Sequence, residues 1–290
     1  DLHSFPTRRS SDLWSSVVYQ SHSPYQRLVV TRWKDDTRLY INGNLQFSSR
    51  DEARYHEALV LPAMQMVSDA SRILILGGGD GLAAREVLKY PQVKHVTLVD
   101  LDPDMTATFK TSAALSALNQ GSLSHPKMHV VNDDAAKWLE GSSEKFDVII
   151  IDLPDPSNFS LGKLYSVPIY RLVARHLQPQ GKIVVQSTSP YFAPNAYWSV
   201  VATLEAAGLS TAPYHVYVPS FGEWGFVLAG FDKQFPVPQK FDVPTRYLNA
   251  QTAAEMFLFP PDMARRKVEP NYLNNQILVS YSSKDRKSVV

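Results

Sequence analysis

Short apolar runs alternate with amphipathic stretches through the middle of the chain. The stretches between the runs, at about 81–89, 103–118, 134–140 and 164–177, have the spacing of helices. The apolar runs, each of strand length, are RILIL, HVTLVD, KMHVV, FDVIII and KIVVQS. This alternation predicts an α/β fold, with a mostly parallel sheet covered by helices on both faces.

The N-terminal part has a different pattern, in which strands are separated by turns. Residues 27–33, 37–41 and 44–47 are expected to be β-strands. Asn42 and Gly43 separate the second strand from the third, and this pair is a strong hairpin signal because both residues tolerate a positive φ. The pattern predicts a small antiparallel β-domain that precedes the α/β sheet.

Further elements follow from capping residues and apolar runs. DEARYHEALVLPAM is expected to be a helix, because Ser48 or Ser49 can cap it and Asp51 and Glu52 lie in its first turn. A second helix is expected over NAYWSVVATLEAAG, with Gly208 as its C-cap. The runs YHVYVPS and WGFVLAG are expected to form a closing pair of strands.

The two ends of the chain are expected to be foreign to the fold. Residues 1–13 and 285–290 resemble translated sequencing-adapter DNA, and the first residue is Asp rather than Met, so we expect the natural N-terminus to lie elsewhere. The predicted domains are then a β-hairpin domain at 14–50, a Rossmann-like catalytic domain at 51–235 and a C-terminal wrap at 236–284.

The composition excludes several kinds of chemistry. The 290 residues include no cysteine, which rules out disulfides, thiolate catalysis and zinc–sulfur sites. The formal net charge is +1, so no excess of basic residues points to nucleic acid. No apolar run approaches the roughly 18–20 residues that span a bilayer.

The first strand of the α/β region ends in a glycine-rich turn, which predicts a nucleotide site. Glycines at Gly77, Gly78, Gly79 and Gly81 let the backbone approach a ligand, and the following helix offers free N–H groups. Tight packing of the strand on the helix is the alternative explanation.

Acidic residues end the next two strands. Asp100 follows HVTLVD at the place where a carboxylate commonly binds ribose hydroxyls, although it could instead cap a helix. Asp134 and Ala135 follow the third strand, where a carboxylate could accept the adenine amino group or only cap the helix after it. The stretch from Asp100 superficially resembles a calcium loop, but Met105 and Thr111 occupy its two strictest positions, so no metal site is predicted.

Asp80 gives the glycine turn a negative charge. This charge would repel the α-carboxylate of S-adenosylmethionine and attract the cationic amine of its decarboxylated form. The alternative is an Asp80 that points to solvent or caps the helix.

Two more carboxylates follow the fourth strand of the sheet. Asp152 and Asp155 flank Pro154, and acids at this end of a parallel strand face the ligand crevice. Together they could hold a diamine by its ammonium groups, with Asp152 as the general base for the attacking amine. A solvated turn is the alternative. Residues 155–166 are expected to form either a gate that excludes water or an ordinary surface loop.

Several separated motifs together resemble one known family. They are SPYQ, LYINGNLQFSSRDEARYHE, LGGGDG, VDLD, NDDA, DLPDP and VPSFGEWGF, between about Tyr25 and residue 230. The chain resembles the spermidine synthases, which are polyamine aminopropyltransferases. The resemblance implies a methyltransferase-like catalytic domain that transfers an aminopropyl group from decarboxylated S-adenosylmethionine to putrescine or a similar polyamine, with methylthioadenosine as the other product and no permanently bound cofactor.

The resemblance also implies roles for individual residues. Asp152 would accept the proton. His56, which could otherwise be a core histidine, lies with three other residues along the implied amine path: Tyr55, His56, Asp80 and Asp155. The implied nucleoside-binding residues are Gln26, Gly77, Gly79, Asp100, Asp134 and Ala135.

The chain departs from the family pattern at several positions. Asp100 stands where the family usually has Glu, and Phe221 stands where a substrate-contacting Tyr is expected, which leaves the length of the amine acceptor open. Glu223 could supply a further amine-binding carboxylate or could be an ordinary surface acid.

The resemblance implies small-molecule partners, a homodimer and a cytoplasmic location. Relatives with the spelling DLPDPSNFSLGKLYS look like cytosolic portions of larger membrane-anchored chains, so anchoring through an N-terminal region is an additional expectation. Two other functions are compatible with the same residues: an S-adenosylmethionine-dependent methyltransferase, and a non-catalytic protein that binds polyamine or nucleoside.

Overall fold

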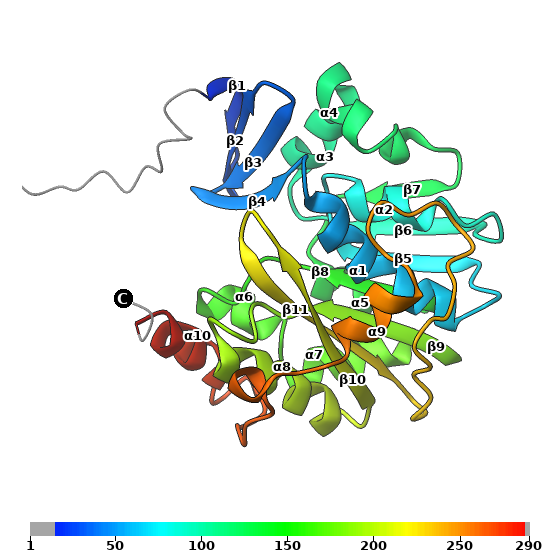
Figure 1. The fold of residues 1–290 in the computed structure, drawn as a ribbon, viewed down its shortest axis with the longest axis vertical. Coiled ribbons are helices and arrows are strands. Elements are labelled where there is room, and N and C mark those ends of the chain that lie inside the picture. The colour runs from blue at the N-terminus through cyan, green and yellow to red at the C-terminus, as the bar shows by residue number, and fades with distance from the viewer. Residues whose placement is uncertain (1–14, 288–290) are drawn as a thin grey trace, which may run out of the picture. The chain divides into compact units, whose positions relative to one another are not determined.

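The computed structural model describes residues 15–287, which fall into two compact units (Figure 1). The first unit ends at Glu52 and the second begins at Ala53. The predicted foreign segment at 1–13 lies outside the described residues, and so does the end of the predicted tail, at 288–290.

The N-terminal unit is a four-stranded antiparallel sheet with the strands in chain order. Its second, third and fourth strands confirm the sequence prediction, and so does the turn at Asn42 (φ 51°) and Gly43 (φ 84°). The first strand was not predicted. The strands are β1 (Ser16–His22), β2 (Arg27–Trp33), β3 (Asp36–Ile41) and β4 (Asn44–Ser48).

The second unit is built on a seven-stranded sheet in the order β10-β11-β9-β8-β5-β6-β7. The five strands from β9 to β7 pair in parallel, while β11 and β10 add an antiparallel hairpin at one edge, so the predicted α/β fold and the closing pair of strands are confirmed. The strands are β5 (Arg72–Gly77), β6 (His95–Val99), β7 (Met128–Val131), β8 (Phe146–Asp152), β9 (Leu177–Gln186), β10 (Ser210–Val218) and β11 (Gly222–Gly230).

Helices connect the strands, as the sequence pattern predicts. The stretch at 103–118 forms two helices rather than one, because the backbone at Ser112 is extended (ψ 122°). The helices are α1 (Glu52–Met66), α2 (Leu82–Val87), α3 (Pro103–Thr111), α4 (Ala113–Leu118), α5 (Ala135–Gly141), α6 (Phe159–Lys163), α7 (Val167–Arg175), α8 (Pro194–Ala206), α9 (Ala250–Met256) and α10 (Ile277–Lys287). Short 3₁₀ turns occur at η2 (Ser122–Ser124) and η3 (Pro261–Met263).

The sheet is buried on both faces, which explains its continuous apolar strands. Leu74 and Leu76 of β5 pack in one cluster with residues of α5, α7 and α8. Ile73 and Ile75 point to the other face, since side chains alternate along a strand, and they are fully buried as well. Parallel strands covered in this way lose the alternation of apolar and polar residues that marks a half-exposed sheet.

The C-terminal segment belongs to the second unit and contains α9 and α10. Asp285 lies in α10, although the predicted foreign tail begins there. Its carboxylate accepts hydrogen bonds from the backbone N–H of Ala196 (3.1 Å) and from Asn195 Nδ2 (2.8 Å), at the start of α8. The ordered helix therefore extends beyond the boundary predicted at residue 284.

Gly77, at the end of β5, has no room for a side chain. Its φ is 81°, and an added Cβ would lie 2.2 Å from the carbonyl oxygen of Asp152. Gly208, which follows α8, also has a positive φ (91°), but an added Cβ there would meet no atom within 4 Å. Substitution at Gly208 therefore tests the unfavourable backbone conformation alone, whereas substitution at Gly77 tests the same conformation together with a steric clash.

We expect Gly77→Ala to destabilise the protein much more than Gly208→Ala. In Gly208→Ala only the left-handed backbone opposes the substitution, so the free energy of unfolding should fall by roughly 1 kcal/mol. In Gly77→Ala the new side chain also forces two strands apart, so the free energy of unfolding should fall by about 3 kcal/mol in total. Urea denaturation of the two variants measures the difference. If both variants lose the same free energy of unfolding, the close contact between Gly77 and Asp152 does not restrict the residue at position 77.

Candidate active site

The candidate site lies at the carboxyl ends of β5, β6 and β8. The strand order changes direction at β5, which has β6 on one side and β8 on the other, and ligands of open α/β sheets bind at such a point. Gly77 pairs with Asp152 at the ends of β5 and β8. The glycine turn and the acidic turn, which are far apart in the sequence, therefore meet at one edge of the sheet.

Asp152 is the last residue of β8 and makes a short hydrogen bond with α1. The hydroxyl of Tyr55 donates to Asp152 Oδ1 at 2.5 Å. The ring of Tyr55 lies edge-on to that of His56, with centroids 4.9 Å apart. The structure thus brings together three residues that the sequence analysis placed in the reaction.

Asp155 is held by groups at the end of β9. Its Oδ1 accepts a hydrogen bond from Gln186 Nε2 (3.3 Å), and its Oδ2 accepts one from Thr188 Oγ1 (3.4 Å). Trp224 Nε1 donates in turn to Gln186 Oε1 at 3.1 Å. Sequence reasoning missed Gln186, Thr188 and Trp224, although a polar residue at the end of the buried run KIVVQ was a usable signal for the first of them.

The turn between the two carboxylates is fixed by backbone contacts. The hydroxyl of Tyr165 donates to the carbonyl oxygens of Leu153 (2.9 Å) and Pro154 (3.1 Å). Gln186 Nε2 donates to Leu153 O (2.5 Å) and to the hydroxyl oxygen of Tyr165 (2.8 Å). The separation of Asp152 from Asp155 is therefore set by a bonded network.

The environment of Asp152 makes its carboxylate a better base than a solvated one. Desolvation raises the pKa of Asp152, and the negative charge of Asp100 raises it further, while a charge on His56 and the hydrogen bond from Tyr55 act in the opposite direction. Desolvation also raises the pKa of the Tyr55 and Tyr165 hydroxyls, and the nearby carboxylates add to this effect. At neutral pH both phenols are therefore hydrogen-bond donors.

Asp100 follows β6 and binds the glycine turn directly. Its Oδ2 accepts from the backbone N–H of Gly79 (2.9 Å), and its Oδ1 accepts from that of Asp102 (2.9 Å). A Cβ at Gly79 would lie 2.5 Å from Asp100 Oδ2, so any larger residue there would displace this carboxylate. The helix cap that was the alternative role for Asp100 is supplied by Asp102, whose side chain accepts from the N–H of Asp104. Burial raises the pKa of Asp100 to about 6.

Asp80 lies in the glycine turn and is 8% exposed. Its Oδ1 accepts a hydrogen bond at 2.9 Å from the backbone N–H of Leu82, the first residue of α2, while Gly81 occupies the N-cap position of that helix. The charge of Asp80 also raises the pKa of Asp100, which means that the two carboxylates interact across the site.

Asp134 caps the helix that follows β7. Its Oδ1 accepts from the backbone N–H of Lys137 at 2.9 Å, and Ala135 is the first residue of α5. The capping role expected as an alternative is therefore present, and the binding of adenine by these two residues stays a prediction.

Glu223 takes part in a different group of contacts. Its Oε2 lies 2.9 Å from Nδ1 of His215, with which it forms an ion pair when the imidazole is protonated. Trp224 reaches Gln186, and successive residues of a strand point to opposite faces, so Glu223 points away from the face that Trp224 occupies. Among the described residues, no hydrogen bond or ion pair joins Glu223 to Asp155.

Phe221 and Gln26 are placed by the structure in two different units. Phe221 contacts Tyr55, with ring centroids 6.0 Å apart, and so lines the site where a hydroxyl was expected. Gln26 lies in the N-terminal unit, in the turn between β1 and β2, where its N–H donates to Ser23 Oγ. Its binding role stays a prediction.

The stretch predicted to be a gate contains a short helix. The side chain of Asn158 accepts a hydrogen bond from the N–H of Leu161 (3.0 Å) and so caps α6. Phe159, the first residue of this helix, is 66% exposed. An apolar side chain so exposed beside an acidic turn is compatible with a segment that closes over a ligand.

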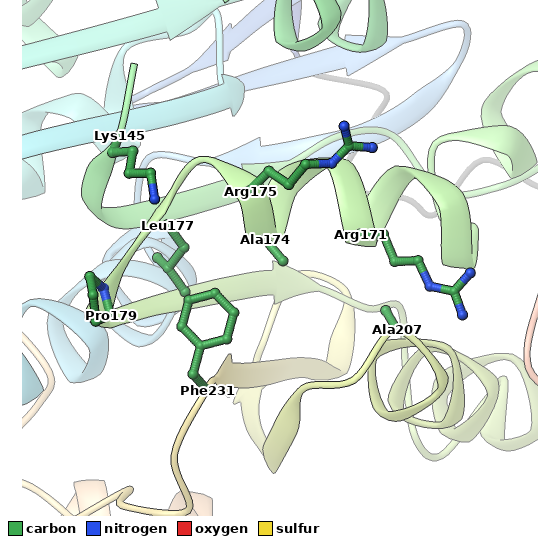
Figure 2. A pocket seen from close by; sticks show the side chains of 8 residues that line it. All are labelled: Lys145, Arg171, Ala174, Arg175, Leu177, Pro179, Ala207 and Phe231. Carbon is green, nitrogen blue, oxygen red and sulfur yellow. The ribbon is translucent and has the colours of Figure 1, made fainter. Parts of the chain in front are cut away.

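A pocket of about 510 Å³ lies at the other end of the parallel strands from the candidate site (Figure 2). Lys145 precedes β8 and Leu177 begins β9, so this pocket is at the amino ends of the parallel strands. In Figure 2 the guanidinium groups of Arg171 and Arg175 extend away from Leu177 and Phe231. The described residues that line it include three cations and no acid: Lys145, Arg171, Ala174, Arg175, Leu177, Pro179, Ala207 and Phe231. It suits a cationic substrate poorly.

Residues 15–287 contain no group of three or more His, Cys, Asp or Glu side chains that could hold a metal ion. The same residues include no helix that is long and apolar enough to cross a membrane.

Comparison with curated proteins gives close relatives. The chain is 62% identical over 275 residues to polyamine aminopropyltransferase 2 of Ralstonia nicotianae, a match that covers 94% of this chain and 54% of the relative. It is 49% identical over 271 residues to the polyamine aminopropyltransferase of Leptospira interrogans, which covers 93% of this chain and 54% of the relative. The chain thus spans about half the length of the curated relatives it matches.

Solved structures share the fold. Spermidine synthase from Thermotoga maritima superimposes with a TM-score of 0.76 at 22% identity, over 94% of this chain and 88% of that one. A spermidine synthase in complex with the transition-state analogue AdoDATO superimposes with a TM-score of 0.75 at 21% identity, over 94% of this chain and 87% of that one.

A family match covers most of the second unit and the residues of the candidate site in it. It runs over residues 52–240, which include the acidic turn and the glycine turn, and is described as the spermine/spermidine synthase domain. With the site geometry and the fold, this match identifies the chain as a member of the spermine/spermidine synthase family.

Proposed function

We propose that this chain transfers an aminopropyl group from decarboxylated S-adenosylmethionine to putrescine or a similar polyamine. The observation that carries the proposal is the pair of carboxylates, Asp152 and Asp155, in one hydrogen-bonded turn beside the glycine turn of a Rossmann-like sheet. The names of the relatives support the same reaction class.

The reaction needs little covalent chemistry from the protein. The amine nitrogen attacks the propyl carbon next to the sulfonium, the bond between that carbon and sulfur breaks, and the sulfur keeps the electron pair in methylthioadenosine. Because an alkylammonium has no lone pair, the protonated amine must give up one proton before its nitrogen can attack. Since the sulfonium is already a good leaving group, the protein has mainly to orient two cations and to take this proton.

Asp152 is the proposed acceptor of that proton. An alkylamine with a pKa like that of lysine is about three units from neutral, so its deprotonation costs roughly 4 kcal/mol at pH 7. A carboxylate whose pKa is raised by desolvation offsets part of this cost, and Tyr55 holds Oδ1 of Asp152 in a fixed direction. Asp155, fixed by Gln186 and Thr188, would bind the distal ammonium group.

The nucleoside would lie across the ends of β5 and β6. Asp100 is proposed to accept ribose hydroxyls, and its anchoring to the N–H of Gly79 supports this role. Asp80 would attract the amine of the decarboxylated tail. Binding roles for the other predicted residues rest on the family resemblance alone: Tyr55, His56, Gly77, Gln26, Asp134, Ala135 and Glu223.

Some finer expectations are part of the proposal. Decarboxylated S-adenosylmethionine would act as a co-substrate rather than as a bound cofactor. A homodimer, a cytoplasmic location and anchoring of a longer parent chain to a membrane stay predictions that rest on the family resemblance.

Product analysis tests the function directly. Mass spectrometry after incubation with decarboxylated S-adenosylmethionine and a panel of diamines and triamines should show an added aminopropyl group and an equal amount of methylthioadenosine. Asp152→Asn should lower kcat by about 10²–10⁴-fold, because the base is lost, while calorimetric binding of methylthioadenosine changes by less than about twofold. Asp69→Asn, at an exposed acid away from the site, is the matched control. Transfer of a methyl group, or normal turnover by Asp152→Asn, would contradict the proposal.

Tyr55→Phe should move the pH profile. The hydroxyl favours the charged form of Asp152, so its loss should raise the pKa of that carboxylate further. The acidic limb of kcat/KM should therefore shift to higher pH. Tyr217→Phe, at a tyrosine that is 51% exposed, should leave the limb in place. If Tyr55→Phe is active and the acidic limb of its kcat/KM profile is unmoved, Tyr55 does not influence the ionisation of the general base.

Nucleoside binding should weaken in acid. The pKa of Asp100 is raised to about 6, so its carboxylate is ionised above that pH and becomes protonated as the pH falls through it. We expect the affinity for methylthioadenosine, measured by calorimetry from about pH 8 to about pH 5, to fall over the lower part of this range, since a neutral carboxyl accepts ribose hydroxyls less well. Asp100→Asn should bind more weakly and lose this pH dependence. The same pH dependence in wild type and variant would assign the titration to another group.

A further inference from the structure

The C-terminal segment reaches the far end of the predicted gate through one buried side chain. Asn271 precedes α10 and is 0% exposed. Its Nδ2 donates to the carbonyl oxygens of Gly162 and Tyr165, each at 3.0 Å. Both hydrogens of the amide are thus used on the end of the segment 155–166.

The remaining polar groups of Asn271 are also bonded, so the residue itself is fixed. Its N–H donates to Thr203 Oγ1 (2.9 Å) in α8, and its carbonyl oxygen accepts from the N–H of Val167 (3.0 Å) at the start of α7. Its Oδ1 accepts from the N–H of Leu278 (3.1 Å) in α10. Three helices therefore hold Asn271, and Asn271 holds the end of the gate segment.

Tyr165 links Asn271 to the turn that bears the two carboxylates. Its backbone is held by Asn271, its ring is 1% exposed, and its hydroxyl bonds the carbonyl oxygens of Leu153 and Pro154. These two residues lie between Asp152 and Asp155. A continuous set of hydrogen bonds thus runs from the C-terminal segment to the turn that bears the proposed base.

A second contact joins the same two segments. An added Cβ at Gly162 would lie 2.6 Å from Val279 Cγ2, so the end of α6 packs directly on α10. Within 155–166, the part from Gly162 onward is therefore anchored to the C-terminal segment.

We propose that Asn271 is a positioning residue for the amine site. By fixing Gly162 and Tyr165 it sets the closed end of the gate and the geometry of the turn from Asp152 to Asp155. The effect on turnover rests on the proposed function, whereas the anchoring of residues 157–166 does not.

Asn271→Ala tests the proposal against a matched control in the same segment. Asn275→Ala removes an asparagine that caps local backbone, through bonds with Tyr272, Ile277 and Pro270, and that makes no recorded bond to Gly162 or Tyr165. We expect Asn271→Ala to speed hydrogen exchange in peptides covering 157–166 by about tenfold or more, with peptides of β5 and β6 unchanged. The KM for the diamine should rise about tenfold, while the Kd for methylthioadenosine stays within about twofold. Asn275→Ala should match the wild type in all three.

The readouts distinguish this inference from the proposed function. Unchanged exchange at 157–166, or equal effects of the two variants, would overturn the role of Asn271. A wild-type protein that transfers nothing to any amine would overturn the proposed function, and the exchange comparison would still decide the anchoring. If Asn271→Ala does not fold, Tyr165→Phe removes only the hydroxyl that holds Leu153 and Pro154. Its diamine KM should then rise while nucleoside binding persists, and a wild-type KM would refute the proposal.

Discussion

The close approach of two strand ends is the constraint on which the candidate site depends. Gly77 and Asp152 are paired across β5 and β8 so tightly that no Cβ fits between them. This contact brings the glycine turn and the acidic turn together at the carboxyl ends of the parallel strands. It also fixes the carbonyl of Asp152 and thereby the direction in which its side chain leaves the strand. The apolar strands buried on both faces hold the two ends rigidly in place.

The four acids at the carboxyl ends of the strands differ in their hydrogen-bond donors as well as in their positions. Asp100 is engaged by two backbone N–H groups, Asp80 by one, Asp152 by a phenol and Asp155 by an amide and a hydroxyl. Each donor favours an ionised carboxylate, while burial and the neighbouring charges oppose ionisation. The balance leaves Asp100 and Asp152 with pKa values above that of a solvated carboxyl group.

Features that depend on local pattern were predictable from the sequence, and those that depend on tertiary contacts were not. The parallel strands, the hairpin at Asn42 and the acids at strand ends follow from periodicity and turn chemistry. The strand β1 was missed because its residues are mostly exposed and give little apolar signal. The roles of Gln186 and Asn271 were missed because they depend on distant partners. Asp155 lies 31 residues from Gln186, and Gly162 and Tyr165 lie over 100 residues from Asn271, so no local pattern shows these bonds.

The cationic pocket at the amino ends of the strands gives the second unit opposite charges at the two edges of one sheet. Lys145, Arg171 and Arg175 surround that pocket, while the carboxylates gather where the strands finish. A cation near the second unit would be repelled at the amino ends of the strands and attracted at their carboxyl ends, so its approach would be oriented before any contact forms. Such steering acts over about a Debye length of roughly 8–10 Å, so the rate of encounter should be sensitive to the salt around the protein.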